Sequence, residues 1–154
     1  MSSFDIAIQT VLANEGGLEE DKADDGGTTN FGLSQRSYPK LDIKALTVDE
    51  AVAIYKRDFW KFGDVIDQRV ATKVFDSFVN MGRYAIIILQ RIVLKATTVD
   101  GDFGPETLDA VNRADANALL TQYRLALAAH YRNIVASNPE DEKFLEGWLR
   151  RSMQ

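Results

Sequence analysis

Acidic side chains gather in one short stretch of the chain, residues 15–32, which reads EGGLEEDKADDGGTTNFG. This acidic loop holds six carboxylates, two glycine pairs and two threonines, and it shows no apolar periodicity. Such a composition is typical of a turning loop and unsuited to filling a core. It can hold carboxylates in a fixed geometry, so the loop is the first candidate for chemistry.

Two carboxylates that face each other can hydrolyse a glycosidic bond. One carboxylic acid protonates the leaving oxygen, and the other positions water or stabilises positive charge on the sugar. Glu15 suits the first role, because the end of a helix and the neighbouring acids both disfavour its ionised form. The Gly26-Gly27 turn can bring Asp24 or Asp25, and the hydroxyl of Thr29, across a cleft from Glu15.

Metal and phosphate sites fit this loop poorly. An EF-hand that began at Asp21 would have Ala23 at its third position and Gly32 at its twelfth, where ligands are needed. No P-loop motif is present. The chain has no cysteine and a single histidine, His130, which excludes thiolate sites and multi-histidine sites. We therefore expect no metal and no cofactor.

The composition indicates an ordinary globular chain of 154 residues, 45% of them apolar. The net charge of −5 argues against binding to nucleic acid or to an anionic membrane surface. The longest strongly apolar run, residues 84–89, is too short to span a membrane. The N-terminus lacks the pattern of a cleavable signal, so we expect synthesis in the cytoplasm and another route to any outside target.

Apolar spacing predicts a mainly α-helical chain with one irregular acidic loop and a short β-ribbon within residues 28–33. The predicted helices cover residues 3–15, 48–61, 67–81, 84–96, 105–113 and 115–136, and a last one runs from Asn138-Pro139 to Arg151. The segment 84–96 is apolar nearly all round and is expected to be buried. A soft boundary near Gly82 divides the chain into lobes of 1–82 and 83–154, which we expect to pack as one unit.

Three motifs in order resemble the glycoside hydrolase family 108 muramidases, which include phage-type lysozymes and bacterial proteins linked to secretion. The first is NEGG at 14–17 followed by DDGGTTNFG at 24–32, and the second is FDSFVNMG at 75–82. The third, LQ at 89–90 with DGDFGPETL at 100–108, is similar to a peptidoglycan-binding-type region. Position 25, often proline in that family, is aspartate here, so the choice between Asp24 and Asp25 stays open.

The resemblance implies a lysozyme-like fold and a peptidoglycan hydrolase that acts as a monomer at the cell wall or periplasm, after export or lysis. It implies that Glu15 is the catalytic acid, with Asp24 as the second carboxylate and Thr29 as the family's threonine. The bond cleaved would be the β-1,4 link between N-acetylmuramic acid and N-acetylglucosamine. Two other functions stay open: a non-catalytic peptidoglycan-binding or secretion protein, and a lytic transglycosylase that forms a 1,6-anhydro product.

Several further residues are candidates for substrate binding or support. Asp76 and Asn80 lie four apart on one helix face, where they either face the cleft or brace the loop through buried hydrogen bonds. Asp25 and Asn30 belong to the loop itself. Aromatic side chains are candidates for stacking on sugar faces: Tyr38, Tyr55, Trp60 and Phe62. The C-terminal lobe either completes the core or binds glycan.

Overall fold

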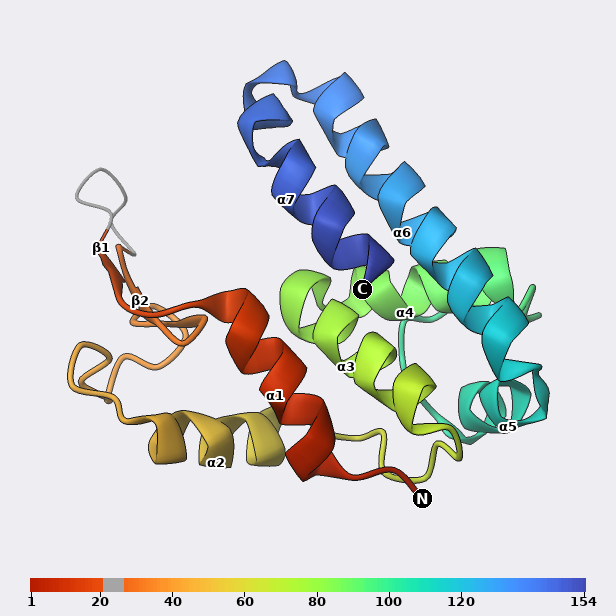
Figure 1. The fold of residues 1–154 in the computed structure, drawn as a ribbon, viewed down its shortest axis with the longest axis horizontal. Coiled ribbons are helices and arrows are strands. Elements are labelled where there is room, and N and C mark those ends of the chain that lie inside the picture. The colour runs from red at the N-terminus through yellow and green to blue at the C-terminus, as the bar shows by residue number, and fades with distance from the viewer. Residues whose placement is uncertain (21–26) are drawn as a thin grey trace.

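A computed structural model describes residues 1–20 and 27–154 (Figure 1). Helices dominate it, as predicted, and a small sheet follows the first helix. In chain order the elements are α1 (Phe4–Glu15), β1 (Glu19–Glu20), β2 (Thr28–Asn30), β3 (Leu33–Ser34), α2 (Val48–Asp58), α3 (Gln68–Met81), α4 (Arg83–Ile88), the π-helix η1 (Leu89–Val93), α5 (Pro105–Arg113), α6 (Ala116–Ser137), the 3-10 turn η2 (Pro139–Asp141) and α7 (Glu142–Met153). The expectation of a mainly α, lysozyme-like fold is confirmed.

The predicted ribbon is a three-stranded antiparallel sheet in the order β1-β2-β3. Thr29 in the central strand pairs with Glu19 on one side and with Ser34 on the other. The turn between β2 and β3 uses positive φ angles at Phe31 (50°) and Gly32 (79°). Because the sheet begins soon after α1 ends, it lies beside the helix end that carries Glu15.

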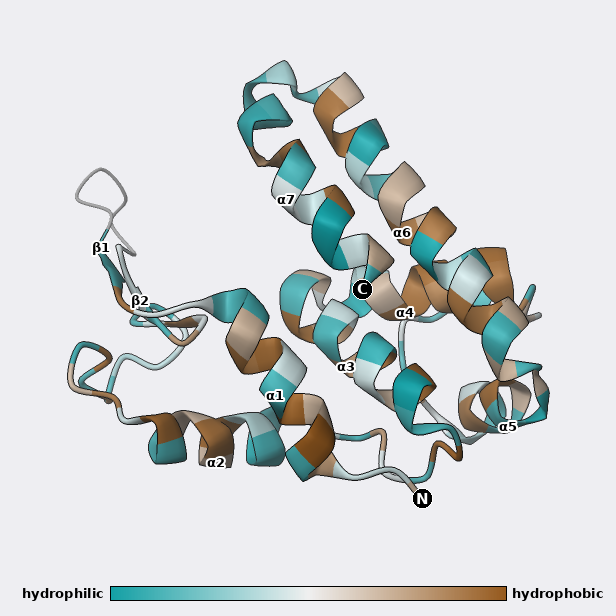
Figure 2. Ribbon diagram, viewed as in Figure 1, coloured by the Kyte–Doolittle hydropathy of each residue, from teal (hydrophilic) through white to brown (hydrophobic). Residues whose placement is uncertain are grey.

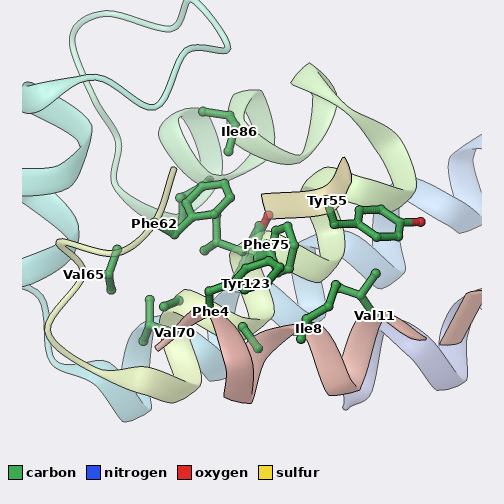
Figure 3. Close-up of a cluster of buried hydrophobic side chains, with 14 of the residues drawn as sticks. Phe4, Ile8, Val11, Tyr55, Phe62, Val65, Val70, Phe75, Ile86 and Tyr123 are labelled. Carbon is green, nitrogen blue, oxygen red and sulfur yellow. The ribbon is translucent and has the colours of Figure 1, made fainter. Parts of the chain in front are cut away.

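One hydrophobic core joins the two halves of the chain. Phe4, Ile8 and Val11 project from α1 into this core, as their spacing predicts, and the centroid of the Phe4 ring lies 6.0 Å from that of the Phe75 ring in α3 (Figure 3). Tyr123 of α6 is fully buried in the same cluster. Figure 2 shows hydrophobic and hydrophilic bands alternating along the helices, as amphipathic packing requires. Helix α3 contacts both α1 and α6, while α6 and α7 run side by side as a helical hairpin (Figure 1).

The segment predicted as one buried helix over 84–96 differs from that expectation. Helix α4 ends at Ile88 and continues as the π-helix η1 to Val93. Ile86 and Leu89 are fully buried, but Ile92 is 54% exposed. A π-turn holds more residues than an α-turn and so changes which side chains face inward. As a result Gln90, which is 1% exposed, occupies the inner face.

Gln90 organises the turn that precedes α5. Its Nε2 lies 3.0 Å from each of three acceptors: Asp100 Oδ1, the Asp102 carbonyl and Thr107 Oγ1. Its Oε1 accepts a hydrogen bond of 3.0 Å from the Gly101 N–H. The motif formed by LQ at 89–90 and by residues 100–108 therefore has a structural role in the fold.

Replacing Gln90 with alanine is expected to destabilise the protein by about 3 kcal/mol, because the buried Gly101 N–H and Thr107 hydroxyl lose their partner. Denaturant unfolding monitored by circular dichroism measures this change. The matched control is Arg91→Ala at the exposed neighbouring position, which is expected to stay within about 0.5 kcal/mol of the original protein. An equal effect of the two substitutions would show that the Gln90 bonds add no stability.

Candidate active site

Glu15 is the last residue of α1, as predicted, and Gly16 ends the helix with a positive φ of 71°. Its side chain is 18% exposed and so lies partly within the protein. Arg151 of α7 donates a hydrogen bond from Nη2 to Glu15 Oε1 at 2.7 Å. A residue 136 positions away therefore holds the first candidate acid, and the sequence analysis did not identify this partner.

Arg151 also binds a second carboxylate, that of Asp76 in α3. Its Nε donates to Asp76 Oδ2 at 3.1 Å and its Nη2 to Asp76 Oδ1 at 2.9 Å, which is the two-pronged geometry typical of strong arginine–carboxylate pairs. Asn14 Nδ2 donates to the same Asp76 Oδ1 at 3.1 Å. The side chain of Asp76 is only 2% exposed. Glu15, Arg151 and Asp76, called here the charged triad, thus tie α1, α3 and α7 together.

The triad and its surroundings fix the ionisation of the neighbouring groups. Burial lowers the pKa of the Arg151 guanidinium, but the hydrogen bonds and charges of Asp76 and Glu15 outweigh burial and raise that pKa above its usual value. Burial raises the pKa of the Tyr55 hydroxyl, and the charge of Glu15 raises it further. Arg151 is therefore a permanent cation, and Tyr55 is a neutral donor.

The turn between β2 and β3 packs directly against the Glu15 carboxylate. A Cβ atom added at Gly32 would lie 2.7 Å from Glu15 Oε2 and 2.7 Å from the Tyr55 hydroxyl. Tyr55 holds the same turn by donating its hydroxyl to the Phe31 carbonyl at 2.7 Å. Only a residue without a side chain fits at this position, so Gly32 lets the ribbon approach the carboxylate.

Family comparisons divide the chain into two regions. Residues 8–82 match the family model described as "Glycosyl hydrolase 108", and residues 84–153 match the model described as "Predicted Peptidoglycan domain". Residues 8–82 belong to the glycosyl hydrolase 108 family. Glu15 and Asp76 therefore lie in the hydrolase region, whereas Arg151 lies in the peptidoglycan domain.

The fold also matches a solved structure over nearly its whole length. The structure of Brucella abortus SagA is 28% identical in sequence and superposes with a TM-score of 0.79. The match covers 97% of this chain and 88% of that chain. A search among curated proteins found no match. Together, the hydrolase region and the peptidoglycan domain make this chain a peptidoglycan-related glycoside hydrolase with a role at the cell wall or periplasm.

Of the four further candidates in the acidic loop, the structure describes Thr29 and Asn30. Asp24 and Asp25 lie outside the described residues. Thr29 is half-buried in β2, and because side chains alternate along a strand it faces away from its neighbour Asn30. Asn30 is buried, and its Nδ2 donates to the carbonyls of Ile43 (3.1 Å) and Leu46 (3.4 Å). Asn30 therefore ties the ribbon to the segment before α2.

The other candidates lie in three different environments. Asp76 is buried within the charged triad. Asn80 accepts a hydrogen bond from the Tyr131 hydroxyl of α6. Tyr38 donates its hydroxyl to Asp58 at 2.8 Å, and burial together with this bond raises the pKa of Tyr38 to about 12. Of these three residues, Asp76 accepts hydrogen bonds from Arg151, which also donates to Glu15.

Two of the four aromatic side chains considered for sugar stacking belong to the core, and the other two, Trp60 and Tyr38, are half-buried against it. Tyr55 and Phe62 are fully buried, so that expectation is wrong for both. Trp60 packs edge-on against Phe75 at 5.1 Å between ring centroids and against Phe4 at 5.6 Å. The aromatic run at the end of α2 therefore fills space between α1 and α3, because large rings bury the most apolar area.

Neither a metal-binding cluster nor a membrane-spanning helix occurs within residues 1–20 and 27–154. In that part of the chain no three histidine, cysteine or acidic side chains are grouped so that they could bind a metal ion. Nor does any helix there have the length and apolar character needed to cross a membrane.

Proposed function

We propose that this protein is an N-acetylmuramidase that cleaves the β-1,4 bond between N-acetylmuramic acid and N-acetylglucosamine in peptidoglycan, with Glu15 as general acid. The observation that carries the proposal is the setting of Glu15 in the hydrolase region. Its carboxylate is partly exposed at a helix end and is held by Arg151 at 2.7 Å. A general acid needs this combination of fixed geometry and access to substrate.

In the proposed reaction Glu15 donates its proton to the leaving sugar oxygen. Asp24, or its neighbour Asp25, then orients water or stabilises the oxocarbenium-like transition state. Thr29 lies in β2, the strand that directly follows the loop with both aspartates, and its hydroxyl helps to hold the attacking water. No cofactor takes part in this mechanism.

The remaining candidates have supporting roles in this proposal. Asn30 shapes the ribbon, Asp76 supports the acid, and Asn80 joins α3 to α6 through Tyr131. Tyr38 is half-buried in the hydrolase region, with its hydroxyl on Asp58, and remains a candidate for contact with a sugar ring. We further propose that residues 1–82 carry the catalytic groups and that residues 83–154 complete the same unit.

Mass spectrometry of fragments released from purified peptidoglycan tests the reaction type. Hydrolysis by water leaves a reducing N-acetylmuramic acid end, and we expect fragments of that kind. Fragments lighter by one water, with 1,6-anhydro ends, would instead identify a lytic transglycosylase. Absence of fragments, from a folded sample that still sediments with cell walls, would identify a non-catalytic peptidoglycan-binding protein.

A further inference from the structure

The charged triad distributes its hydrogen bonds unequally between the two acids. Asp76 receives two bonds from Arg151 and one from Asn14, spread over both of its carboxylate oxygens. Within residues 1–20 and 27–154, Glu15 receives one bond from Arg151, on Oε1. The exposed fractions of the side chains follow the same order, 2% for Asp76, 13% for Arg151 and 18% for Glu15. Asp76 is therefore the fixed charge, and Glu15 is the acid within reach of substrate.

This asymmetry matters because a buried charge is costly unless it is paired. When Glu15 takes up a proton, Asp76 and Arg151 remain as a matched ion pair. If Asp76 were neutral, protonation of Glu15 would leave the Arg151 cation without a carboxylate. Asp76 thus allows Glu15 to hold the proton that a general acid must donate.

Other titratable groups lie around the triad, and the charges of Asp76 and Arg151 act on Lys73 and Tyr131 among them. Lys73 of α3 donates from Nζ to the Arg151 carbonyl at 2.7 Å, and burial lowers the pKa of Lys73 to about 8. Arg124 of α6 interacts with Lys73. Burial raises the pKa of the hydroxyls of Tyr55 (α2) and Tyr131 (α6), which both stay neutral. Because the Asp76 charge raises and the Arg151 charge lowers the pKa of Lys73, the variants below are also compared in a Lys73→Met background, which removes the titration of Lys73.

We propose that Asp76 and Arg151 act as one positioning unit that orients Glu15 and governs whether it carries its proton. The proposal rests on the function proposed above for Glu15. Because Arg151 belongs to the peptidoglycan domain, this domain supplies a positioning residue to the hydrolase site. The two regions then share one catalytic centre.

The test is the pH dependence of kcat on purified cell walls for the full chain and two variants. Activity falls at high pH as Glu15 loses its proton. Arg151→Met removes a cation that favours the ionised form, so this alkaline limb should move up by about 1 pH unit. Asp76→Asn leaves the Arg151 cation without its permanent partner, so the limb should move down by about 1 unit. Both variants should also lose kcat, by about 100-fold, because the carboxyl is less well placed.

The matched control is Arg150→Met, since the Arg150 side chain is 70% exposed and pairs only loosely with Glu146 at 3.5 Å. It should keep the original profile. Arg151→Lys serves as a second variant if Arg151→Met unfolds. It keeps the positive charge, so the alkaline limb should stay at the original pH. Its kcat should fall, because an ammonium cannot form the two-pronged contact with Asp76. Circular dichroism checks folding.

The proposal is supported if the alkaline limb moves up in Arg151→Met and down in Asp76→Asn. If the two residues had only a structural role, the limb would stay in place in both variants. Shifts in the same direction, or profiles that match Arg150→Met, overturn it. The function proposed for Glu15 fails separately. Full activity of Glu15→Gln overturns that function, whereas an inactive Glu15→Gln beside an unaltered Arg151→Met overturns only the role of the positioning unit.

Discussion

Glu15→Gln is expected to hydrolyse purified peptidoglycan about 1,000-fold more slowly than the original protein. Glutamine has the shape of glutamate, and its Oε1 can still accept the bond from Arg151 Nη2. The site geometry therefore persists, but the side chain no longer has a proton to give to the leaving oxygen. The release of reducing sugar ends from cell walls measures the rate.

Glu19→Gln is the matched control for this change. Glu19 lies four residues further along the chain, is exposed and pairs with Thr29 in the ribbon. It should keep full activity. If Glu15→Gln releases reducing ends as fast as Glu19→Gln, another group is the general acid and the proposed reaction is wrong.

Gly32→Ala is expected to reduce activity by about 100-fold and to lower the free energy of unfolding by about 2 kcal/mol. The new methyl group would stand 2.7 Å from both Glu15 Oε2 and the Tyr55 hydroxyl, which is closer than these atoms can approach. The carboxylate or the turn must shift, and a shift of about 1 Å removes the alignment of a general acid. The φ of 79° adds backbone strain for any residue with a Cβ.

Gly17→Ala is the control, because a Cβ at Gly17 meets no atom within 4 Å and its φ is not in the left-handed region. Activity assays and thermal unfolding of the two variants, measured side by side, separate the effect of the contact from that of losing any loop glycine. Equal activity of the two would mean that the ribbon does not hold the Glu15 carboxylate in place.

Local sequence signals predicted the helices and the position of Glu15 well. Gly16 ends α1, and a capping box formed by Thr47 and Glu50 begins α2. Such signals depend on neighbours within a few residues and therefore survive without knowledge of the fold. The π-helix η1 was not predicted, because apolar spacing was read with the period of an ordinary α-helix.

The role of Arg151 could not be read from local pattern. Two arginines at the end of the last helix both suit its dipole, so this local pattern gives them the same role. One signal did distinguish them: Arg151 lies three residues after Trp148, on the side of α7 that also carries the buried Ser152, whereas Arg150 points to solvent. The choice of Glu15 and Asp76 as its partners depends on the packing of α1, α3 and α7, which no short window of sequence contains.

The core shared by both halves of the chain limits how the two regions can be recombined. Tyr123 of the peptidoglycan domain is fully buried and donates its hydroxyl to the Ala85 carbonyl at 2.9 Å, within a cluster that includes Phe75 of the hydrolase region. A chimaera that replaces residues 84–153 with a foreign wall-targeting module would expose this apolar surface and delete Arg151. A module exchange would therefore have to rebuild a packing interface and an arginine together.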